Sequence, residues 1–260
     1  MDLGLSGRAA IVTGASRGIG RAIALALAAE GASVLLCARQ PASLDAVAAE
    51  IGGAAATVAI DVTDPGAATA IVTRCQEAFG RLDVLVNNAG SAMPKPLVDL
   101  TAEDWHDAME LNFLSAARLA VAAGPVMAAG GWGRMVHVAS ISGREPDPHF
   151  APYSAAKAAL LNLSTSLAQA FGPAGVLSTC VVPGITITEL VAENAEAAAE
   201  QSGTSPDDIV AKMLRKHRVP VGRFGQPHEV AAAVVFLCSE QASWINGATL
   251  EVDGGTLRSS

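Results

Sequence analysis

The stretch AAIVTGASRGIGRAIALALAAEG (residues 9–31) joins an apolar run to an alanine-rich segment through a glycine-rich loop. Residues 9–13 predict a buried strand, and residues 18–31 have the apolar spacing of a helix. Between them, Gly14, Gly18 and Gly20 are spaced as G-x-x-x-G-x-G. Glycines there allow a tight turn and a close approach to a diphosphate, whose charge is stabilised at a helix N-terminus. The stretch therefore predicts a dinucleotide-binding unit.

The same alternation of strand and helix continues along the chain. The runs that predict strands are 9–13, 33–38, 57–61, 82–89, 133–140, 175–183 and 248–254. The further segments with helical spacing are 41–51, 65–79, 102–123, 151–171 and 226–239. Alternating elements indicate a parallel sheet, and continuously apolar strands indicate that helices cover both of its faces. We therefore predict one α/β domain over residues 1–260, a Rossmann-type, doubly wound parallel sheet of seven strands.

Residues 185–218 interrupt this rhythm. They carry two short helical patterns, at 189–201 and 205–216, and no strand. The segment follows the carboxyl end of a predicted strand, which is where ligands bind in open α/β sheets. We expect residues 185–218 to form a lid over the substrate.

Composition narrows the class of protein. The chain has a formal net charge of −8, a hydrophobic content of 51% and no basic run, so we expect neither nucleic acid nor membrane as a partner. Four scattered cysteines without a C-x-x-C pair indicate reduced, buried thiols, and five dispersed histidines indicate no metal site. The first residues lack the pattern of a signal peptide. These observations favour a cytoplasmic globular protein.

The end of the second predicted strand bears on the choice of cofactor. Sites for NAD usually place an acidic residue there to bind the ribose 2′-hydroxyl, whereas an arginine accommodates the 2′-phosphate of NADP. This chain has Cys37-Ala38-Arg39, and Arg17 in the glycine loop adds a second guanidinium. We therefore predict a preference for NADP(H), with NAD(H) as the alternative.

The only tyrosine of the chain, Tyr153, precedes one of its four lysines, Lys157, by four residues. Positions four apart share one face of a helix, so the two side chains point the same way. Tyrosine has a pKa of about 10, and a nearby ammonium would lower that pKa toward neutrality. The pair therefore predicts a tuned acid/base, with Ser140 close by because it ends the preceding strand.

These motifs, taken together, resemble the short-chain dehydrogenase/reductase family over essentially the full length. The matching residues are TGASRGIG (13–20), Asp61-Val62, Asn87-Asn88-Ala89-Gly90, Asn112, Ser140, YSAAK (153–157) and Pro183-Gly184 with Thr188. The resemblance implies an oxidoreductase that interconverts a ketone and a secondary alcohol. The residues expected to contact the cofactor are Gly14, Ser16, Arg17, Gly18, Ile19, Gly20, Arg39, Asp61, Val62, Asn88, Ala89, Gly90, Tyr153, Lys157, Pro183, Gly184, Ile185 and Thr188.

The resemblance also implies a catalytic set. Ser140 would bind the substrate carbonyl, and Tyr153 would donate or accept the proton. Lys157 would hold the nicotinamide ribose, and Asn112 would anchor a water in a proton relay. Because all four residues are present, a protein that only senses NADP(H) is the minor alternative.

The substrate is less constrained by the sequence. The residues expected to contact it are Ser140, Ser142, Arg144, His149, Tyr153 and Leu190. Many members of the family reduce 3-oxoacyl groups on acyl carrier protein, an acidic partner that needs a basic rim. The corresponding stretches 128–131 and 172–175 contain no lysine or arginine, although Arg215, Lys216 and Arg218 in the expected lid could supply such a rim. We therefore favour a free small-molecule ketone, with the carrier-borne substrate as the alternative, and the resemblance implies a homotetramer, or else a homodimer.

Overall fold

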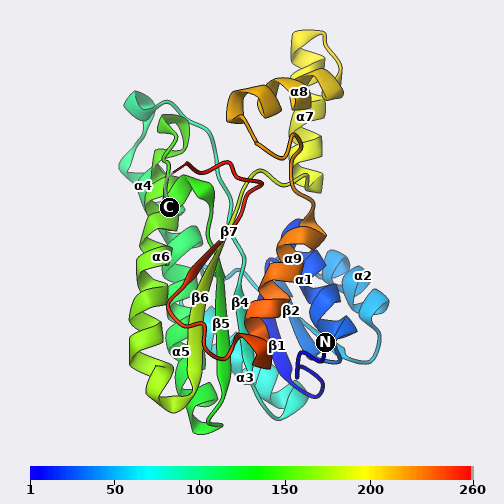
Figure 1. The fold of residues 1–260 in the computed structure, drawn as a ribbon, viewed down its shortest axis with the longest axis vertical. Coiled ribbons are helices and arrows are strands. Elements are labelled where there is room, and N and C mark those ends of the chain that lie inside the picture. Colours follow the sequence, from blue (N-terminus) through cyan, green and yellow to red (C-terminus); the bar gives the residue numbers. More distant parts are fainter. Residues whose placement is uncertain (259–260) are drawn as a thin grey trace.

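The computed structural model describes residues 1–258, except the side chain of Leu190. Its centre is a sheet of seven parallel strands in the order β3-β2-β1-β4-β5-β6-β7 (Figure 1). The strands are β1 (Ala9–Thr13), β2 (Ser33–Ala38), β3 (Ala55–Ala59), β4 (Val84–Asn87), β5 (Gly133–Val138), β6 (Val176–Pro183) and β7 (Thr249–Val252). The strand order reverses direction between β1 and β4, and a ligand crevice forms at such a switch point. The predicted fold class is confirmed.

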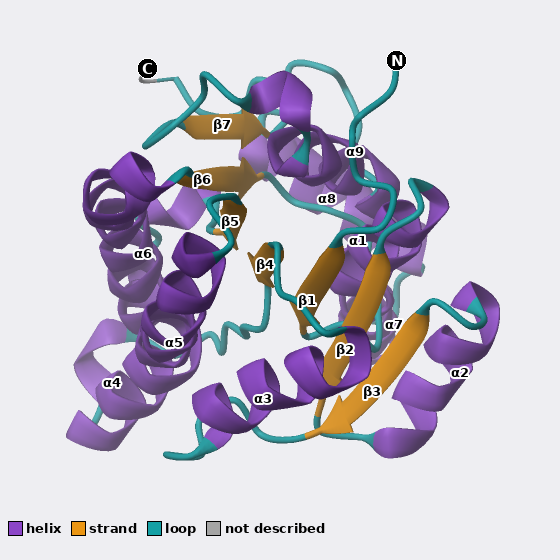
Figure 2. Cartoon of the chain, turned by 90° about the horizontal axis from the view of Figure 1, so that it is seen from below, coloured by secondary structure: helices purple, strands orange, loops and turns teal. Residues whose placement is uncertain are grey.

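Helices cover both faces of the sheet (Figure 2). The larger ones are α1 (Gly18–Ala29), α2 (Pro41–Ile51), α3 (Ala67–Phe79), α4 (Ala102–Met109), α5 (Ser115–Ala129), α6 (Ala151–Phe171), α7 (Glu189–Ser202), α8 (Pro206–His217) and α9 (Pro227–Cys238). Helices α1, α2 and α9 bury one core with β1, β2 and β4 to β6, and α3, α5 and α6 bury a second core on the opposite face. Apolar burial on both faces explains why the central strands are apolar at every position.

The predicted helix over 102–123 differs from the observed structure. Helix α4 passes into a π-helical turn at Glu110–Leu114, and α5 then continues to Ala129, beyond Pro125. Proline has no N–H, so the carbonyl of Val121 lacks its helical donor, and Val121 is exposed to water. The run 102–129 is long and apolar enough to cross a membrane by length and composition alone, but 44% of its most apolar window is buried inside the protein. Among the described residues it is the only helix of that kind.

Helices α7 and α8 form the predicted lid, which projects beyond the carboxyl ends of the strands (Figure 1). Each begins at a hydroxyl side chain that accepts a backbone N–H: Thr188 for α7 and Ser205 for α8. Such N-caps stabilise a helix start by about 1 kcal/mol, which explains why two short, polar helices persist outside the core.

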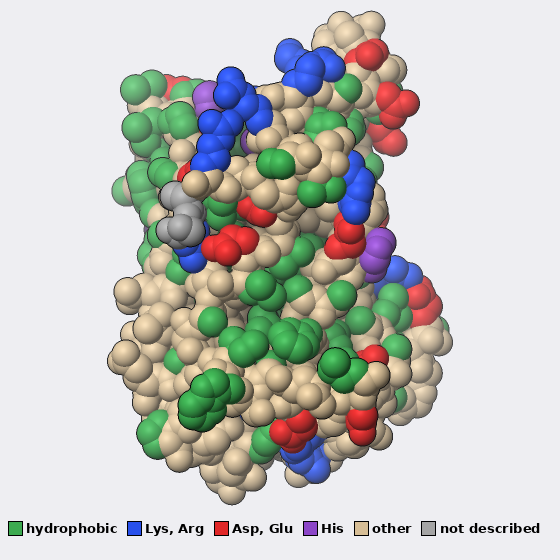
Figure 3. All heavy atoms as spheres, in the orientation of Figure 1, with side chains coloured by type: hydrophobic (Ala, Val, Ile, Leu, Met, Phe, Trp, Pro, Cys, Tyr) green, Lys and Arg blue, Asp and Glu red, His purple; other side chains and the backbone are tan. Residues whose placement is uncertain are grey.

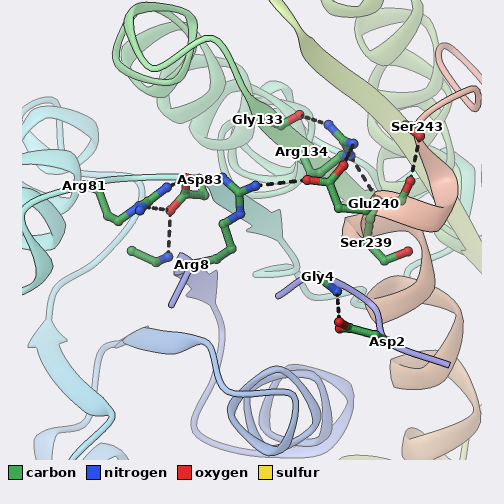
Figure 4. A network of polar contacts seen from close by, with 11 residues as sticks. Asp2, Gly4, Arg8, Arg81, Asp83, Gly133, Arg134, Ser239, Glu240 and Ser243 are labelled. Carbon is green, nitrogen blue, oxygen red and sulfur yellow. Dashed lines mark hydrogen bonds and ion pairs between the residues drawn. The ribbon is translucent and has the colours of Figure 1, made fainter. Parts of the chain in front are cut away.

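The amino ends of the strands are joined by a charged network (Figure 4). Asp83 accepts hydrogen bonds from Arg81 at 2.6 Å and from Arg8 at 3.2 Å, and Arg8 also binds Glu240 at 3.0 Å. The Arg8 guanidinium lies 3.7 Å from the centre of the Trp132 ring, a cation–π contact. This network joins the starts of β1, β4 and β5 to the end of α9. It therefore stabilises the edge of the sheet opposite the carboxyl ends of the strands.

Candidate active site

The glycine loop between β1 and α1 has the geometry that the sequence predicts. Gly14 and Gly18 have φ values of +65° and +57°, which favour glycine. A Cβ on Gly20 would lie 2.2 Å from the carbonyl oxygen of Gly14 and 2.4 Å from Nδ2 of Asn88. The start of α1 therefore stacks directly on the loop and on the end of β4. The backbone N–H groups that result suit a diphosphate.

The end of β4 is fixed to β1 by a small set of hydrogen bonds. The hydroxyl oxygen of Thr13 accepts the backbone N–H groups of Asn88 and Ala89, each at 3.0 Å. Asn88 Nδ2 in turn donates to the carbonyl oxygen of Thr13 at 2.9 Å. The Asn88 side chain thus stiffens the sheet edge, while Asn88, Ala89 and Gly90 all line the cavity above it.

The region expected to hold the adenosine contains a fixed carboxylate and an arginine. Asp61 accepts hydrogen bonds from the backbone N–H and the hydroxyl of Thr63, which lower its pKa, and the nearby Arg39 lowers it further. Arg39 is exposed, lines the cavity and has no ion pair within residues 1–258. Arg17 differs from expectation, because it is paired with Glu193 of α7 at 3.3 Å.

The lid also contacts the glycine loop directly. Glu189, the first residue of α7, accepts the backbone N–H of Gly18 at 2.9 Å. A Cβ on Gly18 would lie 3.1 Å from Cγ2 of Thr188. These contacts could not be predicted from the sequence, because Glu189 and Gly18 are far apart in the chain. A carboxylate therefore uses an N–H that the loop would otherwise offer to a diphosphate.

Ser140, Tyr153 and Lys157 meet at the floor of the cavity. Ser140 follows β5, and Tyr153 and Lys157 lie on one face of α6 near its start. The ammonium of Lys157 is buried, donates to the carbonyl oxygen of Val138 at 2.8 Å and lies 5.6 Å from the centre of the Tyr153 ring. The sequence argument thus placed the three side chains correctly.

The pKa values at the floor differ from expectation. Burial raises the pKa of Tyr153, and a hydrogen bond with Ser140 partly offsets that effect. Burial also lowers the pKa of Lys157, to about 8. Lys157, whose ammonium is bound to the carbonyl oxygen of Val138, is not among the groups that shift the pKa of Tyr153, and the tuned acid/base pair stays a prediction.

Asn112 lies in the π-helical turn and fixes the segment after β4. Its Oδ1 accepts the N–H of Ser91, and its Nδ2 donates to the carbonyl oxygen of Ser91, each at 3.0 Å. A Cβ on Gly90 would lie 2.6 Å from Oδ1 of Asn112 and 3.3 Å from Nζ of Lys157. Only glycine at position 90 leaves room for Asn112 and Lys157 directly behind it; Lys157 lines the cavity, and Asn112 does not.

The expected substrate residues divide into two groups. Ser140, Ser142 and Tyr153 line the cavity. Arg144 instead pairs with Glu251 at 3.2 Å, and His149 is exposed beside Asp147, so neither lines the cavity. The side chain of Leu190 lies outside the described residues.

One continuous cavity of about 1740 Å³ connects the glycine loop to the floor and the lid. Of the residues expected to contact the cofactor, all line it: Gly14, Ser16, Arg17, Gly18, Ile19, Gly20, Arg39, Asp61, Val62, Asn88, Ala89, Gly90, Tyr153, Lys157, Pro183, Gly184, Ile185 and Thr188. The cavity is also lined by Met213, Lys216, His217 and Arg218 of the expected lid, and by Ser91 and Phe150. Sequence reasoning missed Arg258, which only the path of the last segment brings to the cavity.

Within the described residues, no three side chains of the metal-binding types cluster. The four cysteines are free and buried, and burial raises the pKa of Cys180 to about 11. Thiols with raised pKa values are poor nucleophiles, so the chemistry of the site rests on hydroxyl, phenol and ammonium groups.

Comparison with known proteins places this site among oxidoreductases. Residues 14–256 match the protein family described as enoyl-(acyl carrier protein) reductase. The 3-oxoacyl-[acyl-carrier-protein] reductase of Escherichia coli is 36% identical over 253 residues, covering 97% of this chain and 98% of that protein. The cis-4-hydroxycyclohexanecarboxylate dehydrogenase of Sinomonas cyclohexanicum is 39% identical, covering 95% of this chain and 96% of that protein. The crystal structure of L-sorbose reductase from Gluconobacter frateurii with NADPH and L-sorbose has a TM-score of 0.96, 35% identity and full coverage of both chains.

Proposed function

The chain belongs to the short-chain dehydrogenase/reductase family of oxidoreductases acting on CH–OH groups, and from that premise we propose that it reduces a free small-molecule ketone with NADPH. The observation that carries the proposal is the meeting of Ser140, Tyr153 and Lys157 at the floor of the cavity that begins at the glycine loop. The bound nicotinamide cofactor supplies the hydride. The residues of this chain orient the carbonyl and move the proton.

Each residue at the floor has a distinct proposed role. The hydroxyl groups of Ser140 and Tyr153 donate hydrogen bonds to the carbonyl oxygen, and Tyr153 transfers its proton as that oxygen becomes an alcohol. The raised pKa of Tyr153 keeps the phenol protonated, which suits a proton donor. Lys157 holds the nicotinamide ribose, and Asn112 anchors the water through which protons reach the site. In the oxidative direction the same groups act in reverse.

The proposed preference for NADPH rests on Arg39. No acidic residue stands at the end of β2 to bind a ribose 2′-hydroxyl, and Arg39 is an uncompensated guanidinium at the adenosine end. Arg17 can join it only by leaving Glu193. The L-sorbose reductase structure, which is a complex with NADPH, supports this choice of cofactor.

The relatives support two substrate classes. L-Sorbose and cis-4-hydroxycyclohexanecarboxylate are small molecules, whereas the relative from E. coli acts on a carrier-borne acyl group. We favour the small substrate because 128–131 and 172–175 lack the basic residues that an acidic carrier would require. We also propose a cytoplasmic homotetramer. Val121, Trp244 and Leu250 are exposed apolar side chains that such an assembly could cover.

NADPH consumption tests the proposal. The panel contains a 3-oxoacyl thioester and neutral aliphatic, cyclic and polyhydroxylated ketones, with Tyr153→Phe as the blank. We expect at least one free ketone to be reduced with a higher kcat/KM than the thioester. A preferred thioester would establish the carrier-type reductase instead. Binding of NADPH without consumption of any carbonyl compound would indicate a sensor and overturn the proposal.

A further inference from the structure

Arg218 has an unusual backbone conformation at the end of α8. It has φ 51° and ψ 44°, in the left-handed region, and it is the only non-glycine residue of the described chain with a positive φ. Helices α3 and α7 end in the same region on glycines, Gly80 and Gly203. A side chain there costs about 1 kcal/mol relative to glycine. An arginine held at such a position indicates that its side chain has a task.

Arg218 is among the residues that line the cavity at its lid end. It is exposed, and within residues 1–258 its guanidinium makes no hydrogen bond or ion pair. Two other cations line the same mouth, Lys216 and Arg258. Lys216 lies 3.8 Å from Asp147, and the backbone N–H of Arg258 donates to Glu145 at 3.1 Å. Figure 3 shows Lys and Arg side chains gathered on the upper part of this face, with a His beside them.

The position of Arg218 is fixed by the segment that follows it. Val221 N–H donates to the carbonyl oxygen of Gly254 at 3.3 Å. A Cβ on Gly254 would lie 2.9 Å from Cγ1 of Val219. Residues 219–221 are thus packed against the chain end, so Arg218 is not on a freely moving loop.

The phosphates of the cofactor do not account for this cation. The groups that suit those phosphates are the amides of the glycine loop, which contacts the start of α7, and the guanidinium of Arg39 after β2; Arg218 instead follows α8, next to the segment that packs on the chain end. A cation at the lid end therefore faces the substrate. We propose that Arg218 binds an anionic group, a carboxylate or a phosphate, carried by the substrate away from its reacting carbonyl. This inference rests on the proposed function and names its substrate class.

The surroundings favour a small anion over an acidic protein. Glu145 and Asp147 line the same mouth and would repel an extended acidic surface. A single carboxylate or phosphate needs only one guanidinium, which binds it with two parallel N–H groups.

The test compares ketones that differ only in charge. One pair is 4-oxocyclohexanecarboxylate and its carboxamide, and the other is dihydroxyacetone phosphate and dihydroxyacetone. The variants are Arg218→Asn, which removes the charge but suits the left-handed region, and Arg218→Lys, which keeps the charge. Arg215→Gln is the control, since Arg215 is exposed on the same last turn of α8 and does not line the cavity.

We expect the charged member of at least one pair to have the higher kcat/KM in the wild-type protein. Arg218→Asn should lower the ratio of kcat/KM for the charged ketone to kcat/KM for its neutral partner about tenfold, the size expected for losing one charged hydrogen-bond pair. It should leave the melting temperature at or above that of the wild type. Arg218→Lys should retain most of the preference and Arg215→Gln all of it. Which pair responds distinguishes carboxylate from phosphate.

Three results would overturn the inference: no preference for either charged ketone, a preference that survives in Arg218→Asn, or an equal loss in Arg215→Gln. The last would point to a broad acidic partner. Calorimetric binding of the same compounds to the protein loaded with NADP⁺ separates this inference from the proposed function. Arg218-dependent binding of the charged compound without turnover keeps the anion site and rejects the reaction. Equal turnover of neutral and charged ketones keeps the proposed reaction and rejects the anion site.

Discussion

Replacing Glu189 with glutamine should tighten the binding of NADPH. Oε2 of Glu189 accepts the N–H of Gly18 at 2.9 Å, at the N-terminus of α1. The diphosphate of NADPH requires this same terminus, so the carboxylate competes with it and repels it. Glutamine keeps the shape of the side chain and removes only the charge.

The expected change in the free energy of NADPH binding follows from two modest electrostatic effects. An exposed carboxylate at a helix N-terminus contributes about 0.3–1 kcal/mol, which the cofactor must replace. Repulsion between that carboxylate and a diphosphate about 8 Å away adds about 0.5 kcal/mol per charge in a largely aqueous setting, and salt reduces it. Their sum of about 1 kcal/mol corresponds to a dissociation constant about fivefold lower for Glu189→Gln.

Fluorescence titration of NADPH at low and high salt measures the effect. Glu196→Gln is the matched control, because Glu196 is exposed on the same helix and makes no ion pair among the described residues. We expect the gain in Glu189→Gln to shrink at high salt and to be absent in Glu196→Gln. Equal or weaker binding by Glu189→Gln, or the same gain in both variants, would refute the reasoning.

Three further substitutions probe the site and the core. Arg39→Asp should shift the ratio of kcat/KM for NADPH over NADH toward NADH by at least about tenfold, since it replaces an attraction for the 2′-phosphate with a repulsion; an unchanged ratio would reject Arg39 as the determinant. Gly90→Ala should lower kcat about tenfold or more with little change in stability, because its Cβ would displace Asn112 and Lys157; a normal kcat would show that their placement is unimportant. Burial lowers the pKa of His137 to about 4, so the folded state holds it neutral. Stability from this group is complete above pH 6.5 and is lost as pH falls toward 4, by about 3 kcal/mol. The free energy of unfolding, measured with denaturant at pH 4–7, should fall less steeply with decreasing pH in His137→Gln than in the wild type. The same pH dependence in both proteins would contradict a lowered pKa of His137.

The sequence predicted the order and type of nearly every strand and helix. Central strands such as Ile11–Val12 and Leu85–Val86 are apolar at every position because both faces are buried, and that pattern is visible without a structure. The boundaries were less certain: β3 begins at Ala55 rather than 57, where alanines give no strand signal. The π-helical turn was missed because it depends on the tertiary contact between Asn112 and Ser91.

The site was predictable where function requires a local motif. The glycine loop and the four-residue spacing of Tyr153 and Lys157 are such motifs, and their placement agrees with expectation. The pKa of Tyr153 was not predictable, because it depends on how deeply the phenol is buried and on where Lys157 donates. The pairing of Arg17 with Glu193 and the left-handed conformation of Arg218 were also not predictable, since each depends on how the lid folds.

The central claim is that Tyr153 supplies the proton for carbonyl reduction. The most direct measurement is single-turnover oxidation of bound NADPH by the best ketone of the panel, in the wild type and in Tyr153→Phe, with NADPH affinity determined on the same samples. The account predicts that Tyr153→Phe still binds NADPH, within about threefold of the wild type, and oxidises it at least about a hundredfold more slowly. Oxidation by Tyr153→Phe at more than about a tenth of the wild-type rate would contradict the claim and place the proton donor elsewhere.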